Sequence, residues 1–213
     1  MVTGAMLLGF APSMSMAAEE QPGLATAVLE TLPVKGRAPK TGYARDQFGQ
    51  AWADVDRNGC DTRNDILQRD LTSIMYKTGT RNCVVLSGTL VDRYSGETIN
   101  FVRGNVSSME VQIDHVVALS NAWQTGAFKL STDQRKALAN DPLNLFAVKG
   151  SLNQQKSDGD AATWLPPLKS FRCAYVAQQI AVKAKYSLWV VPPEKAAMVA
   201  ILAKCPTQKV PAI

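Results

Sequence analysis

The sequence predicts an α+β fold in one folded body. Apolar residues make up 46% of the 213 residues, which is enough to bury a sizeable core. Short segments that alternate between apolar and polar residues, as strands do, are mixed with segments of helical periodicity. Because no internal repeat or low-complexity block is visible, we expect a single domain.

The N-terminal segment 1–17 resembles a secretory signal. It is apolar, carries no charged side chain and closes on Ser15-Met16-Ala17, a small-residue cleavage pattern, although a basic start is missing. A buried N-terminal helix is the alternative. The segment is too short to span a bilayer comfortably, and no other stretch approaches 18 continuous apolar residues. We therefore expect a secreted protein with no stable membrane association.

The folded body is expected at residues 43–205. Residues 18–42 are rich in Pro, Gly, Ala and Lys and are predicted to be a linker with one short helix at 24–32. Residues 206–213 are predicted to be a tail.

Local patterns place the elements of the body. Apolar residues at helical spacing predict a helix over 63–76, and 83–91 and 98–102 are strand-like segments joined by the turn 92–96. Residues 109–113 alternate and lead into Asp114-His115 as a third strand.

The second half continues with a helix over 131–140, which opens on the capping box Ser131 to Gln134. A short strand at 143–148 and a helix capped by Ser151 follow it. The last two predicted helices cover 172–185 and 193–204, and Pro193 suits a first helical turn.

The cysteines favour an oxidising compartment. Cys60, Cys83, Cys173 and Cys205 form no CxxC pair, and an even number at wide spacing is typical of disulfides. Three pairings are open, and Cys60–Cys83 with Cys173–Cys205 is the local one. Four buried thiols in a cytosolic protein are the alternative.

Charge and histidine content restrict the chemistry. The 23 Lys and Arg against 18 Asp and Glu leave a net charge of +5, which suits a polyanion without requiring one. The chain contains one histidine, His115, which excludes HExxH zinc sites and two-histidine iron sites.

His115 and three other polar residues suggest a metal-dependent reaction. Asp114 and His115 are neighbours at a strand end, so their side chains point in roughly opposite directions. Asn153 lies nine residues after Asn144. The short strand and turn between these two residues can fold Asn153 back onto the strand that carries Asp114. A carboxylate and an amide oxygen are hard ligands suited to Mg²⁺, and a neutral imidazole beside them can accept a proton from water.

The motifs Ile113-Asp-His-Val-Val117, Asn144-Leu-Phe and Asn153-Gln-Gln-Lys-Ser-Asp158 resemble the HNH, or ββα-metal, endonucleases, and the last resembles the HNH domain of RNA-guided DNA nucleases. The rest of 43–205 is similar to small secreted actinobacterial HNH proteins. The segments that carry this similarity are Arg45–Gly49, Trp52, Gly59–Arg63, Ala122-Trp123 and Trp164–Pro167.

This resemblance implies a ββα-metal core with an added β-hairpin and flanking helices, stapled by disulfides. It implies Asp114 and Asn153 as metal ligands and His115 as general base. It also implies that Asn144 hydrogen-bonds backbone across the loop. Because Asn153 stands where a histidine is common, the resemblance favours Mg²⁺ or Mn²⁺ over zinc.

Three further features have competing interpretations. Lys156, one turn after Asn153, is a candidate phosphate contact or a solvated lysine. Arg63 is a second phosphate candidate or a salt-bridge partner. The segment Asp54–Asp65 resembles an EF-hand Ca²⁺ loop, but its twelfth residue is Asp and its seventh is Cys60, which favours a turn and helix N-cap instead.

The leading hypothesis is therefore a secreted, metal-dependent endonuclease that acts on nucleic acid, DNA first, with little sequence specificity. The alternative is a noncatalytic extracellular calcium-binding or nucleic-acid-binding module with a relic HNH core. We make no prediction of the oligomeric state.

Overall fold

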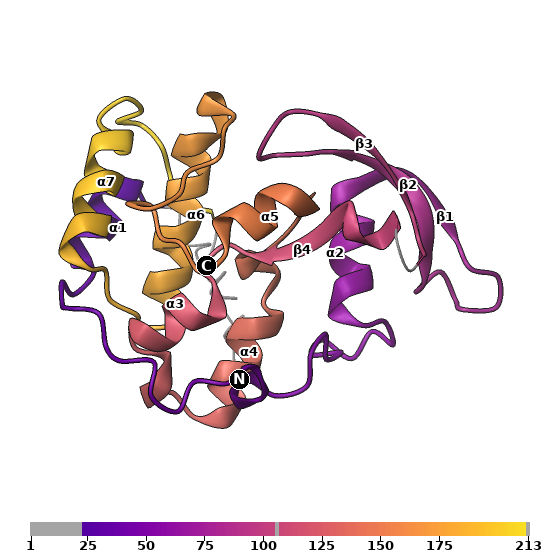
Figure 1. The fold of residues 1–213 in the computed structure, drawn as a ribbon, viewed down its shortest axis with the longest axis horizontal. Coiled ribbons are helices and arrows are strands. Elements are labelled where there is room, and N and C mark those ends of the chain that lie inside the picture. Colours follow the sequence, from indigo (N-terminus) through magenta and orange to yellow (C-terminus); the bar gives the residue numbers. More distant parts are fainter. Residues whose placement is uncertain (1–22, 105–106, 212–213) are drawn as a thin grey trace, which may run out of the picture.

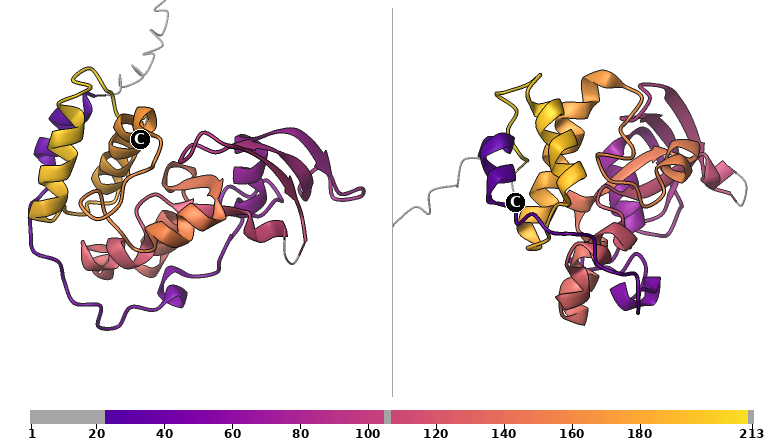
Figure 2. Two further views of the ribbon diagram at one scale, coloured as in Figure 1. Left: turned by 45° about the horizontal axis from the view of Figure 1, so that its top comes forward. Right: turned by 60° about the vertical axis from the view of Figure 1, so that its left-hand side comes forward.

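The computed structural model describes residues 23–104 and 107–211, and the signal-like segment 1–17 lies outside them. The fold is α+β, as predicted. A three-stranded sheet lies at one end of the molecule and a group of helices at the other, with a two-stranded sheet and a helix between them (Figures 1 and 2).

The first sheet is antiparallel, in the order β1–β2–β3. Its strands are β1 (Leu71–Tyr76), β2 (Val85–Val91) and β3 (Thr98–Val102), and α2 (Thr62–Asp70) precedes them. The two strands predicted at 83–91 and 98–102 are confirmed as β2 and β3.

The single helix predicted over 63–76 is wrong in its second half. The helix ends at Asp70, and Leu71–Tyr76 pairs with β2 through an irregular register between Thr72 and Met75. Ser73 lies in the left-handed region, with φ of 51°, which gives a bulge. Apolar residues at a bulged strand can mimic helical spacing, so pairing with β2 decides the outcome.

The second sheet pairs β4 (Val111–His115) with β5 (Leu145–Lys149), and α5 (Gly150–Lys156) follows directly. Apolar β5 side chains are buried on both faces. Leu145 and Ala147 join the core under the three-stranded sheet, whereas Phe146 and Val148 join the core of the helical end. A strand buried on both faces needs a continuous apolar run, as found at 145–148.

The N-cap predicted at Ser151 is wrong, because α5 already begins at Gly150 and has no side-chain cap. The turn brings Gly150 against the chain before β4, where its N–H donates to the Glu110 carbonyl over 2.8 Å. A Cβ at Gly150 would lie 1.9 Å from the Met109 carbonyl oxygen, so only glycine fits this crossing.

The described residues form five further α-helices: α1 (Ala25–Thr31), α3 (Leu119–Gln124), α4 (Thr132–Asn140), α6 (Arg172–Lys185) and α7 (Pro192–Leu202). The capping box of α4 is present as predicted, with Ser131 and Gln134 bonded to each other's backbone N–H. None of the described helices has the length and apolarity that crossing a bilayer requires.

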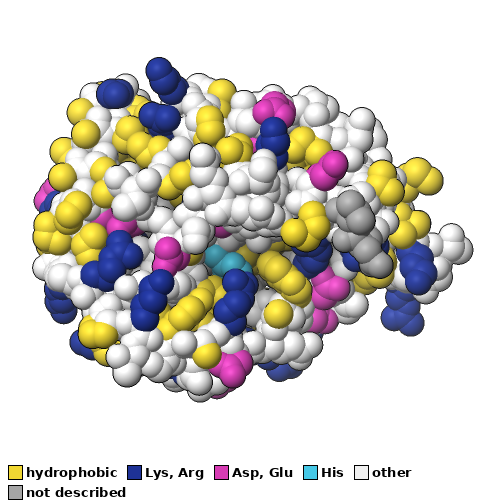
Figure 3. Space-filling view, viewed as in Figure 1, with side chains coloured by type: hydrophobic (Ala, Val, Ile, Leu, Met, Phe, Trp, Pro, Cys, Tyr) yellow, Lys and Arg dark blue, Asp and Glu magenta, His cyan; other side chains and the backbone are white. Residues whose placement is uncertain are grey.

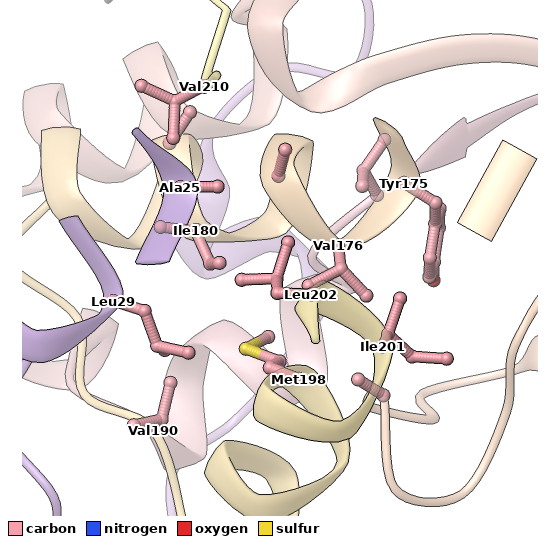
Figure 4. Close-up of a cluster of buried hydrophobic side chains, with 14 of the residues drawn as sticks. Ala25, Leu29, Tyr175, Val176, Ile180, Val190, Met198, Ile201, Leu202 and Val210 are labelled. Atoms are coloured by element: carbon pink, nitrogen blue, oxygen red, sulfur yellow. The ribbon is translucent and has the colours of Figure 1, made fainter. Parts of the chain in front are cut away.

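The predicted linker and tail are part of the folded body over their described residues. Helix α1 forms as predicted, but Ala25 and Leu29 are almost fully buried against α6 and α7 (Figure 4). Leu24 bridges to Lys209, and Val210 is buried beside them. Within the described parts of these segments, residues 23–42 and 206–211 supply apolar surface to the core of the helical end.

Both disulfides follow the local pairing. Cys60–Cys83 joins the loop before α2 to the segment before β2, and Cys173–Cys205 joins α6 to the end of α7.

Candidate active site

The polar residues of β4 face two different surroundings. Gln112 and Asp114 lie on the face that contacts α5, where they bond with Asn153 and Lys156. His115 instead contacts Trp52 and the end of α4. The opposite directions expected for neighbours on a strand are therefore present.

Asp114 is a buried carboxylate with two strong partners. Lys156 Nζ lies 2.9 Å from Oδ1, and the Tyr94 hydroxyl donates to Oδ2 over 2.5 Å. Burial raises the pKa of Asp114, whereas the Lys156 charge and the hydrogen bonds from Tyr94 and Lys156 lower it. The ammonium of Lys156 also donates to the His115 carbonyl over 2.8 Å.

These contacts correct the prediction for Lys156. Its side chain is buried and bonded to Asp114, so in this structure it does not offer its charge to a phosphate at the surface. The helical spacing placed it on the same side of α5 as Asn153. Whether that side faces solvent or protein depends on β4, which covers it.

His115 is held with one ring nitrogen free for chemistry. Nε2 lies 2.9 Å from the Ala139 carbonyl oxygen. A carbonyl only accepts hydrogen bonds, so Nε2 carries the proton and Nδ1 carries the lone pair of the neutral ring. Burial lowers the pKa of His115 to about 4, more than the bond to Ala139 raises it, so the imidazole is neutral at pH 7.

Asn144 ties the loop after β4 to the start of β5. It is fully buried, its Oδ1 accepts from the Val117 N–H over 2.8 Å, and its Nδ2 donates to the Val117 and Leu138 carbonyls. These bonds run across the loop, as the resemblance implies, and the amide is buried among them. Asn144 thus bonds backbone on both sides of the loop.

Asn153 lies beside β4, and Gln112 orients it. Its Nδ2 donates to Gln112 Oε1 over 2.9 Å, so the amide oxygen is the atom that would bind a cation. The sequence prediction missed Gln112 and Tyr94. Gln112 lies two residues before Asp114 and shares its strand face, a signal that was present, whereas Tyr94 comes from the turn before β3 and gave none.

A basic-rimmed cavity of about 700 Å³ joins these groups. Asp114, His115 and Asn153 line it together, and Lys40, Arg45 and Arg63 stand at its wall. Figure 3 shows the histidine near the middle of this face with Lys and Arg side chains gathered around it. We call this space the main cavity.

The two arginines of the main cavity differ from the other cations around the site. Lys40 pairs with Asp158 and Lys156 with Asp114, but Arg45 and Arg63 form no ion pair with any described residue. Burial and the neighbouring Arg103 both lower the pKa of Arg63. Arg63 thus has the charge and position for a phosphate. Arg45, which the sequence prediction did not single out, lines the same cavity.

The donor set fits Mg²⁺ or Mn²⁺. Among residues 23–104 and 107–211, no three His, Cys, Asp or Glu side chains form a metal-binding group. A carboxylate and an amide oxygen are hard donors, and an octahedral ion completed by water and phosphate needs few protein ligands. Each Asp114 oxygen accepts one hydrogen bond and retains a lone pair for a cation.

The segment Asp54–Asp65 folds as the predicted turn and N-cap. Asp54 and Asp56 accept from the backbone N–H of Asn58, and Asp54 also accepts from that of Gly59. Asp61 is the N-cap of α2 and accepts from the Asn64 N–H.

Comparison with known proteins gives a family and one relative. Residues 61–201 match the family "GmrSD restriction endonucleases, C-terminal domain". The chain is 38% identical over 183 residues to an "Uncharacterized secreted protein" of Arthroderma benhamiae, an alignment that covers 85% of this chain and 84% of the relative. No solved structure matches.

The secreted relative and the two disulfides agree with the predicted localisation, so the protein is secreted. The actinobacterial type suggested by sequence stays a prediction. The family match spans the three-stranded sheet, the ββα unit and all four candidate site residues, from Asp114 to Asn153. The chain therefore belongs to the family of GmrSD restriction endonuclease C-terminal domains, an HNH-type nuclease family.

Proposed function

We propose that the protein is a metal-dependent endonuclease that hydrolyses phosphodiester bonds in nucleic acid, with DNA as the first substrate to test. The observation that carries the proposal is geometric: His115, Asp114 and Asn153 line one basic-rimmed cavity together. The family match supports the same reaction class.

In the proposed reaction, Nδ1 of His115 takes a proton from a water molecule, which attacks phosphorus while the bond from phosphorus to the departing oxygen breaks. The bond from Nε2 to Ala139 fixes the ring orientation and the tautomer that this step needs. Asp114 and Asn153 would hold Mg²⁺ or Mn²⁺, and the ion would supply charge neutralisation for the phosphate and the departing oxygen. Arg45 and Arg63 bind phosphates of the substrate strand.

We propose little sequence specificity. The side chains at the wall of the main cavity suit backbone phosphates, and phosphate contacts position a nucleic acid without reading its sequence.

The first experiment tests the general base. Purified protein is incubated with plasmid DNA and Mg²⁺ or Mn²⁺, with and without EDTA. We expect cleavage that EDTA abolishes, and a loss of about 10²–10⁴-fold in His115→Ala, because the step loses its proton acceptor. Glu30→Gln is the control, since Glu30 is an exposed acid remote from the site that pairs with Lys195.

Near-wild-type cleavage by His115→Ala contradicts the assignment. Binding of plasmid without cleavage under every metal condition favours the noncatalytic alternative. A matching circular dichroism spectrum of the variant separates loss of chemistry from loss of fold.

A further inference from the structure

A second, smaller cavity adjoins His115. It measures about 260 Å³, and we call it the side cavity. Phe48, Ala51 and Ala139 belong to its wall, whereas His115, Trp52, Leu119 and Arg45 line both cavities. The two spaces therefore meet at the proposed base, and a substrate that reaches His115 from the main cavity also reaches the mouth of the side cavity.

The walls of the side cavity suit a flat aromatic ring. Phe48 and Trp52 supply aromatic surface, and Leu119 and Ala139 supply aliphatic surface. Gln50 and Asn140 also belong to this wall. Unstacked nucleobases are bound in this way, between aromatic and apolar side chains with a few polar groups. The volume is suited to one ring system and not to a longer segment.

Trp52 is fixed in place for such a contact. Its φ of 57° lies in the left-handed region, which bulky residues rarely adopt. The Trp52 carbonyl accepts from Thr62 N–H, and the Ala53 carbonyl accepts from the Thr62 hydroxyl, which anchors the loop to α2. The indole lies nearly parallel to the His115 ring, with centroids 6.0 Å apart and planes 14° from each other.

We propose that the side cavity binds one unstacked base of the substrate strand, next to the phosphodiester that is cleaved. This inference rests on the proposed function. A phosphate at His115 carries a base only one sugar away, and the apolar space beside His115 is where that base goes. Arg45 lines both cavities, so it contacts the phosphate that lies between His115 and the bound base. Since a paired base must leave its stack to enter, the enzyme prefers single strands and frayed ends over duplex.

The test uses end-labelled single-stranded DNA oligonucleotides in which an abasic site replaces each base in turn. If the proposal holds, loss of the base at one fixed position beside a cleaved bond lowers kcat/KM at that bond at least tenfold, and loss at other positions changes it less than twofold. A uniform effect of all abasic positions, or no effect, overturns the proposal.

Ala51→Leu isolates the side cavity. Ala51 is exposed and lines only this space of the two, so a larger side chain there narrows the side cavity at a residue that is not in the wall of the main cavity. We expect the variant to cleave the intact oligonucleotide as slowly as wild type cleaves the abasic one, with no further loss on the abasic one. Equal losses on both substrates contradict the proposal. Ala196→Leu, on the exposed face of α7, is the matched control.

A binding measurement separates this proposal from the proposed function. Quenching of tryptophan fluorescence is followed with deoxyadenosine 5′-monophosphate and with deoxyribose 5-phosphate, neither of which contains a bond to cleave. Quenching by the nucleotide alone, and its loss in Ala51→Leu, supports the side cavity even if no cleavage of any substrate is found. Cleavage of DNA without base-dependent quenching leaves the nuclease intact and removes the base site.

Discussion

Asp114 sits among opposing effects that decide whether it can hold a cation. Burial is the largest effect and leaves the pKa of Asp114 raised, although an ammonium at 2.9 Å and a hydroxyl at 2.5 Å favour the carboxylate. These two partners come from the end of α5 and from the turn before β3. Groups on two separate elements thus orient the carboxylate. Metal-binding carboxylates are commonly held by such hydrogen-bond partners.

Tyr94→Phe tests this orientation at the scale of one atom. We expect a 10–100-fold loss in apparent Mg²⁺ affinity or activity, because one oxygen of Asp114 loses its donor. The measurement is cleavage rate against Mg²⁺ concentration. Tyr186→Phe is the control. The Tyr186 hydroxyl donates the same kind of hydrogen bond, 2.7 Å long, to Asp141, and neither residue lines the two cavities at His115. If both variants behave alike, Tyr94 has only a structural role.

Among the elements, the ββα unit depends on one close backbone crossing. Gly150 joins β5 to α5 where Met109 approaches, and this crossing sets Asn153 and Lys156 against β4. The sequence pattern indicates a strand, a turn and a helix here. The crossing itself involves residues about forty positions apart, which a local pattern cannot reveal.

Gly150→Ala should destabilise the protein by about 1–3 kcal/mol, the usual cost of forcing an extra methyl group into a packed site. The new Cβ would lie 1.9 Å from a carbonyl oxygen, so the backbone must shift. Thermal unfolding followed by circular dichroism measures the effect. Gly36→Ala is the matched control, because a Cβ there meets no atom within 4 Å. Equal melting temperatures for both variants would contradict this account.

At the scale of the molecule, each disulfide crosslinks one end of the protein. Cys60–Cys83 closes 23 residues near the three-stranded sheet, and Cys173–Cys205 closes 32 residues in the helical end. A disulfide that closes a loop of this length stabilises the folded protein by about 3–4 kcal/mol, because it restricts the conformations of the unfolded chain. Replacing either cysteine pair with serines should clearly lower the urea concentration at which half of the protein is unfolded. An unchanged midpoint would contradict a stabilising role of that disulfide.

Salt dependence tests how the whole basic face meets nucleic acid. If Arg45 and Arg63 each neutralise one phosphate, the logarithm of the DNA binding constant should fall with the logarithm of salt concentration with a slope of about −2. Arg45→Gln and Arg63→Gln should each make that slope shallower by about one. Titrations in Ca²⁺ or EDTA at several salt concentrations measure it, and a flat response would exclude the phosphate contacts.

The sequence by itself determined the α+β class, most element positions and the four polar residues that the motif contains, but it left three disulfide pairings open. The structure decided for the local pairing. Periodicity, capping residues and cysteine spacing are local features, so they can be recognised without knowledge of the fold. Only the tertiary structure decided that 71–76 is a strand, that α1 belongs to the core, and that Lys156 turns inward to Asp114. Each of these outcomes depends on which distant surface covers a segment, and burial against a distant partner leaves no mark in the local pattern.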